Sequence, residues 1–109
     1  MIACFIRYEL DPYKLDAFDE YARNWGQAIP RCGANLIGYF APHEGSLTTG
    51  YGVYTVDSLA DYEAYRARLR ENPVGRENYA FNQRERFIQR EERAFFKLAS
   101  APHAPLVWP

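Results

Sequence analysis

The order in which strand-like and helix-like patterns follow one another constrains this chain most. Residues 2 to 9 are rich in strand formers and largely apolar, which predicts a mostly buried strand. Asp11-Pro12 then opens a helical pattern, and Pro30 and Gly33 are expected to end it. The apolar residues of this helix recur at spacings of three and four and should form one buried stripe: Leu15, Phe18, Ala22, Trp25 and Ile29.

Two strand patterns come next. The first runs from Leu36 to Pro42, and the second passes through Tyr51, Val53 and Tyr54. Glu44-Gly45-Ser46 lies between them and is typical of a turn, so the two strands should pair as a hairpin.

The second half of the chain reads as helix, helix and strand. Ser58 and Asp61 have the spacing of a capping box, which predicts a second helix with Leu59, Tyr62, Arg66 and Leu69 on one side. Asn72-Pro73 should break that helix, and residues 75 to 90 are again expected to be helical. A fourth strand is predicted where Ala94, Phe96 and Leu98 alternate with other residues.

Strand, helix, strand, strand, helix, strand is the split βαβ order. It predicts an α+β fold of the ferredoxin-like βαββαβ kind, with a four-stranded antiparallel sheet whose first and third strands are central. We expect one domain over residues 1–99 and an extended, Pro-rich C-terminal arm over residues 100–109. Helices on one face would leave apolar side chains on the other in water, so a homodimer is expected, with larger assemblies left open.

Composition excludes several classes of partner. The formal net charge is -1, which disfavours nucleic acid, although residues 1–65 hold nine acids and four bases while residues 66–97 hold nine bases and five acids. No apolar run is long enough for a membrane span. Cys4 and Cys32 are the only cysteines and lack metal-site spacing, so a cytoplasmic protein is expected.

The aromatic content of 17% is high for a small chain, and such rings commonly line interfaces or cavities. Tyrosine hydroxyls and arginines on aromatic walls suit a small aromatic or carboxylated ligand. Packing and surface ion pairs are the simpler explanation of the same residues. The candidate ligand-binding residues are Arg7, Tyr8, Trp25, Tyr39, Tyr54 and Arg86.

His43 is the one weak candidate for catalysis, because a loop histidine could act as acid or base near neutral pH. A solvent-facing turn histidine is the simpler interpretation. One histidine is also a poor signal for zinc or haem, and His103 lies in the predicted arm, so we expect no metal and no cofactor. Gly45 to Gly50 lacks the Lys-Ser/Thr of a phosphate loop and is expected to be a hairpin turn.

Scattered residues through most of the chain resemble the NIPSNAP family. They are Tyr8, Leu10, Pro12, Lys14 and Leu15, then Leu36-Ile37-Gly38-Tyr39-Phe40 with Glu44-Gly45-Ser46-Leu47, then Ser58-Leu59-Ala60 and Asn72-Pro73. The resemblance implies a dimeric α/β barrel of undefined activity. Ile6 and Val56 depart from it, since an arginine and an aromatic residue are expected there, and a pocket function carried by those two groups would be absent.

Three functions remain open at this point. The first is a protein of undefined activity that binds a small organic ligand in the barrel cavity. The second is an enzyme, either a cofactor-independent monooxygenase or an isomerase, that uses the same cavity. The third is a protein-interaction module without a small ligand, because fold alone does not decide chemistry.

Overall fold

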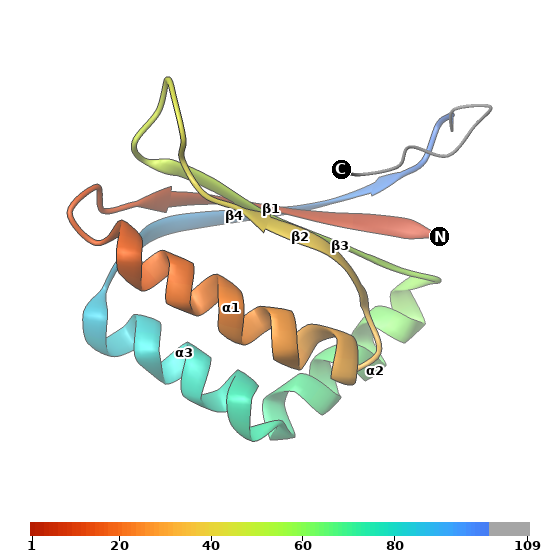
Figure 1. Cartoon of the computed structure of the whole chain (residues 1–109). Helices are drawn as coiled ribbons and strands as arrows, with labels where there is room; N and C mark the ends of the chain where they lie inside the picture. The colour runs from red at the N-terminus through yellow and green to blue at the C-terminus, as the bar shows by residue number, and fades with distance from the viewer. Residues whose placement is uncertain (101–109) are drawn as a thin grey trace.

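Four antiparallel strands form a single sheet in the computed structural model of the chain, which describes residues 1–100. The strands are β1 (Ile2–Leu10), β2 (Asn35–Phe40), β3 (Thr49–Val56) and β4 (Ile88–Lys97). Their order across the sheet is β2-β3-β1-β4, so the prediction that the first and third strands are central is confirmed. Figure 1 shows the sheet as one layer with its helices on one side only.

Buried and exposed residues alternate along β1, and this alternation distinguishes the two faces of the sheet. Cys4, Ile6 and Tyr8 are buried and point toward the helices, whereas Phe5 and Arg7 are exposed on the other face. The register carries this division to the neighbouring strands, because Ile6 lies opposite Gly52 of β3 and Arg93 of β4. Residues far apart in the sequence therefore share the helix side of the sheet.

Three helices cover this side: α1 (Leu15–Arg31), α2 (Leu59–Glu71) and α3 (Pro73–Glu85). The first helix begins at Leu15 rather than at Asp11-Pro12. Asp11 instead closes a turn, because its Oδ1 accepts a 3.0 Å hydrogen bond from the Tyr13 backbone amide.

The buried stripes of the helices differ in phase from the predicted ones. In α1 the buried residues are Phe18, Tyr21, Trp25, Ala28 and Ile29. This stripe is wider than predicted because α1 packs on α3 as well as on the sheet. In α2 the buried residues are Tyr65 and Leu69, while Leu59 is 61% exposed, so Leu59 differs in burial from Leu69, with which it was expected to share one side of the helix.

The boundary between α3 and β4 also differs from the sequence prediction. The helix ends at Glu85, the next residue Arg86 has a left-handed φ of 51°, and β4 starts at Ile88, so residues 88–90 are strand and not helix. The Ile88 amide donates a 3.2 Å hydrogen bond to Asn82 Oδ1, and Leu10 pairs with Ile88 across the sheet. Pairing with β1 overrides the helix-like polar pattern of this segment.

Side-chain caps fix where α2 and α3 begin. Ser58 Oγ accepts a 3.1 Å hydrogen bond from the Asp61 amide, which confirms the predicted cap. The Asp61 carboxylate accepts from the Ser58 hydroxyl instead of from its backbone amide. Asn72 Oδ1 accepts from the amides of Val74 and Gly75 and so begins α3 directly after α2.

Glycines on β3 let aromatic rings lie against the sheet backbone. A Cβ atom at Gly52 would come within 2.8 Å of the Tyr39 ring, and one at Gly50 would come within 3.0 Å of the Phe18 ring. Both distances are shorter than ordinary van der Waals contact. At these two positions the helix side of β3 therefore presents its backbone, and not a side chain, to the rings.

The open face of the sheet, which no helix covers, has an apolar half and a charged half that follow one another along the strands. One half is apolar and includes Phe5, Val53, Ala94 and Phe96, with Phe5 and Phe96 in an edge-to-face contact at 5.3 Å between ring centroids. In the other half, Arg7 lies opposite Glu92 and Glu9 lies opposite Arg90. We call the first half the apolar patch; its other members are Ala3, Ile37 and Thr55.

Most of the predicted C-terminal arm lies outside the described residues, which end at Ser100. His103 and the three prolines of the tail belong to that part of the sequence. Among the residues that the structure describes, no helix combines the length and the apolar character that crossing a membrane requires.

Candidate functional site

A small cavity lies between the helix side of the sheet and the helices. Its volume is about 20 Å³, which is enough for one ordered water or for one small chemical group. Six tyrosines and two arginines contribute to its wall. The lining residues are Ile6, Tyr8, Tyr21, Trp25, Ile29, Tyr39, Tyr54, Tyr65, Arg66, Leu69, Tyr79, Glu91 and Arg93.

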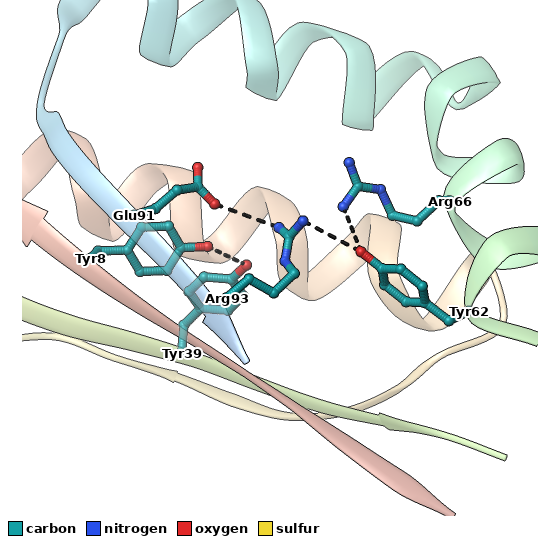
Figure 2. Close-up of polar contacts among 6 residues, drawn as sticks. All are labelled: Tyr8, Tyr39, Tyr62, Arg66, Glu91 and Arg93. Carbon is teal, nitrogen blue, oxygen red and sulfur yellow. Dashed lines mark hydrogen bonds and ion pairs between the residues drawn. The ribbon is translucent and has the colours of Figure 1, made fainter. Parts of the chain in front are cut away.

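Two tyrosine hydroxyls meet at the sheet wall of this cavity. The Tyr8 and Tyr39 hydroxyl oxygens are 3.1 Å apart, although their strands, β1 and β2, lie on opposite sides of β3 (Figure 2). Burial raises the pKa of both phenols well above the ordinary value, and so does the proximity of each to other tyrosines. Both hydroxyls therefore stay protonated at neutral pH and serve as hydrogen-bonding groups rather than as bases.

Two arginines converge on a single tyrosine between α2 and β4. Arg66 Nη1 donates to the Tyr62 hydroxyl at 2.9 Å, and Arg93 Nη1 donates to the same oxygen at 3.4 Å (Figure 2). The only carboxylate in this group is Glu91, whose Oε2 lies 3.5 Å from Arg93 Nη2. Two guanidinium groups thus face one carboxylate, and the cluster carries a net charge of +1 because arginine stays protonated.

Two donors that belong to the cavity wall have no hydrogen-bond partner among residues 1–100. They are Trp25 Nε1 and Arg66 Nε, both buried, and the Trp25 side chain is only 3% exposed. A buried donor without an acceptor costs about 1–3 kcal/mol. A ligand that supplied an acceptor would remove this cost, so these two atoms make the cavity the candidate binding site.

The structure brings four of the six predicted ligand-binding residues together. Tyr8, Trp25, Tyr39 and Tyr54 all line the cavity. Arg7 does not, because strand alternation places it on the open face, one residue away from Tyr8. Arg86 is exposed at the left-handed end of α3, away from the cavity wall. His43 is exposed in the loop between β2 and β3.

Sequence reasoning missed the polar residues that complete the wall. Glu91 and Arg93 are opposite Tyr8 and Ile6 in the register of β4 with β1, so a strand beginning near residue 88 would have placed them on the helix side. Tyr65 was missed because of the phase of α2, whereas Arg66 was expected on the same side of that helix as Leu69 but was not counted among the ligand-binding residues. For Tyr21, the three-residue step from Phe18 was an available signal.

Neither cysteine offers an obvious reactive centre. Cys4 and Cys32 are buried free thiols, and burial raises the pKa of Cys4, which keeps the sulfur protonated. Within residues 1–100, no three His, Cys, Asp or Glu side chains gather as a metal site requires.

The fold and the cavity define an α+β protein of the ferredoxin-like arrangement, with a polar, aromatic-walled cavity under its helices. The family model described as NIPSNAP matches residues 3–102. The chain therefore belongs to the NIPSNAP family, as its sequence resemblance suggested. No curated protein matches the chain.

Solved structures with the same fold include other members of this family. A NIPSNAP family protein of Agrobacterium tumefaciens is 28% identical, covers 97% of this chain and 98% of its own, and has a TM-score of 0.71. An uncharacterized NIPSNAP-like domain protein of Burkholderia xenovorans is 25% identical, with coverages of 99% and 94% and a TM-score of 0.73.

A protein of Nitrosomonas europaea, whose suggested identity is an antibiotic biosynthesis monooxygenase, has the same fold. It is 14% identical, covers 92% of this chain and 100% of its own, and has a TM-score of 0.71. At that identity the similarity concerns the fold alone.

Proposed function

We propose that this NIPSNAP-family protein binds a small organic ligand, aromatic or carboxylated, in the cavity between its sheet and helices. The observation that carries the proposal is the pair of buried donors without acceptors, Trp25 Nε1 and Arg66 Nε. A bound oxygen or other acceptor would satisfy both. The phenol groups of the wall add further hydrogen-bonding positions and flat apolar surface.

The cavity volume limits how a ligand enters. About 20 Å³ accepts a single small group, so the rest of any organic ligand must lie outside the cavity or displace side chains of its wall. Arg66 and Arg93 also line an outer groove together with Tyr62, which makes the side between α2 and β4 the natural entrance.

We propose further that the protein works as a homodimer whose subunits pair through the open face of the sheet. The apolar patch supports this, because Phe5 is 40%, Ile37 is 50% and Phe96 is 55% exposed within one continuous surface. Contiguous apolar surface of this kind is unusual in a monomer and is stabilised when a twofold partner covers it.

Ligand binding is tested by melting temperature across a panel of small acids, amides and phenols. A compound that binds only the native state raises the melting temperature by mass action. Trp25→Phe should abolish the shift, and Trp108→Phe is the matched control because it changes the only other tryptophan. If no compound raises the melting temperature, the ligand proposal fails and an interaction module is favoured.

A second candidate is an enzyme that uses the same cavity, as a cofactor-independent isomerase or monooxygenase. The specific observation in its favour is the Glu91 carboxylate, which lines the cavity together with neutral tyrosine hydroxyls. A carboxylate base and phenol donors suit proton transfer next to a carbonyl group. Deuterium exchange from solvent into a bound carbonyl compound, lost in Glu91→Gln with binding retained, would support this activity, and oxygen consumption would separate the two reactions.

The cytoplasm is the compartment we propose. Cys4 and Cys32 are free thiols in the core, and a reducing compartment keeps such thiols unpaired. Fractionation of the tagged protein would test this.

A further inference from the structure

We infer that the group recognised in this cavity is a carboxylate, held by Arg66 and Arg93, with one of its oxygens within reach of Trp25. The inference rests on the proposed ligand binding and names the chemistry of the ligand. It makes Arg66 and Arg93 the residues that determine specificity.

The three residues that carry the donors line the same small cavity. Trp25, Arg66 and Arg93 come from α1, α2 and β4, and all three line a cavity of only about 20 Å³. In so small a volume, a single group of two or three atoms contacts several parts of the wall. Trp25 Nε1 and Arg66 Nε would both gain an acceptor from it.

Charge favours an anion over a neutral acceptor. The two guanidinium groups share one phenol oxygen, that of Tyr62, and one partly exposed carboxylate, that of Glu91. A carboxylate adds opposite charge to the hydrogen bond from a guanidinium group, and the planar fork of arginine matches the two carboxylate oxygens. A carboxylate ligand therefore replaces Tyr62 as the better acceptor.

The outer groove supplies the path and the place for the rest of the ligand. It is lined by Tyr62, Glu63, Arg66, Arg70 and Arg93, so arginines outnumber carboxylates by three to one there. Arg66 and Arg93 belong to the groove and to the cavity alike, and Figure 2 shows both guanidinium groups directed at the Tyr62 hydroxyl. The carboxylate points inward and the body of the ligand lies in the groove.

The test uses acetate and acetamide, which have nearly the same shape and differ in charge. The Trp108→Phe protein has a single indole N–H signal in a ¹⁵N correlation spectrum, that of Trp25. At constant ionic strength, acetate should shift this signal in a saturable way, and acetamide should bind at least tenfold more weakly. Inorganic phosphate, which is larger and tetrahedral, should leave it unshifted.

Arg66→Gln provides the residue test, and Arg70→Gln is its matched control. Both arginines lie on α2 one turn apart and line the groove, but only Arg66 lines the cavity. We expect Arg66→Gln to weaken acetate binding tenfold or more and Arg70→Gln to weaken it less than threefold. Arg66→Lys keeps the charge without the planar fork and should fall between them; it also replaces Arg66→Gln if that variant does not fold.

The outcomes separate this inference from the ligand proposal. If acetamide shifts the Trp25 signal as tightly as acetate, the cavity binds ligands but the carboxylate inference is wrong. Equal losses in Arg66→Gln and Arg70→Gln would also overturn it, because attraction by the groove charge alone would then explain binding. If acetate, acetamide and every compound of the panel leave the signal in place, both proposals fail.

Discussion

The two faces of the sheet are built from alternate residues of the same strands, yet they differ in what their side chains contact. On the helix side, Tyr8 is buried and Arg93 is partly exposed, and both have hydrogen-bonding partners at the wall of a small cavity. On the open side, Phe5 and Phe96 contact each other and remain partly exposed. The helix side has buried polar groups, two of which lack an acceptor, and the open side has exposed apolar surface.

This difference indicates which face suits the binding of a small molecule and which suits association with another subunit. Polar groups that are buried among rings have fixed positions and suit recognition of a small molecule. A flat apolar surface has no such positions but gains free energy from being covered. The proposed ligand site and the proposed dimer interface therefore lie back to back on one sheet, and the following experiments perturb one face at a time.

Alkaline pH should have the largest effect, and it acts on the helix side. Burial raises the pKa of Tyr8, Tyr21, Tyr39, Tyr54 and Tyr65. Below pH 10 these phenols are protonated in both states, whereas above it the unfolded chain loses protons that the folded chain keeps. Stability should then fall by about 1.4 kcal/mol per pH unit for each tyrosine.

Urea unfolding between pH 8 and 11, followed together with tyrosinate absorbance, measures this loss. Tyr8→Phe should make the fall of stability with pH less steep by the contribution of one tyrosine. Phenols that ionise near pH 10 while the chain stays folded would show that the helix side is open to water.

The next largest effect is expected from truncating an aromatic ring, and the loss of stability should be larger on the helix side than on the open side. Phe18 is buried among Tyr8, Tyr21 and Tyr39, so Phe18→Ala should lower the free energy of unfolding by about 3–5 kcal/mol. Phe96→Ala, at a half-exposed ring, should cost under about 1 kcal/mol in a single subunit. Urea unfolding at submicromolar concentration measures both, and equal losses would contradict the contrast drawn between the faces.

A charge on the apolar patch should weaken the proposed dimer. Phe96→Glu places a carboxylate in both copies of a twofold interface, and we expect the dissociation constant to rise about 100-fold. Leu59→Glu makes the same change at an apolar residue of similar exposure on α2 and should leave association unchanged. Sedimentation velocity measures the association, and a wild-type chain that stays monomeric at micromolar concentration would remove the basis for this proposal.

The smallest effect is expected at the cap of α2, the helix that carries Tyr62 and Arg66. Ser58→Ala removes the acceptor of the Asp61 amide and should cost about 1 kcal/mol. Ser58→Thr keeps the hydroxyl and should recover most of the loss. Thermal unfolding measures both variants, and a full loss with Thr would show that the hydroxyl is not the stabilising group.

The fold was predictable because it depends on patterns that are local in the sequence. Strand formers in residues 2 to 9 and the apolar spacing from Phe18 to Ile29 define elements before any contact is known. The split βαβ order then leaves few topologies, and the observed order β2-β3-β1-β4 is the expected one.

The site was predictable only in part because its wall depends on phase and register. Tyr8, Tyr39 and Tyr54 could be placed once their strands were assigned, but Arg7 was included without regard to the alternation that turns it away from Tyr8. Arg93 could not be placed while residues 75 to 90 were expected to be helical, since its side of β4 is set by pairing with β1. Contacts formed by pairing are not encoded in any local pattern.

The glycines of β3 carry a lesson for protein engineering. Because the ring of Tyr39 rests on the peptide groups around Gly52, that wall has no side chain to exchange for a smaller one, and any larger residue there collides with the ring. Efforts to enlarge the cavity for bulkier molecules should therefore concentrate on the helices above it, and selected variants from a random library should spare this stretch of strand.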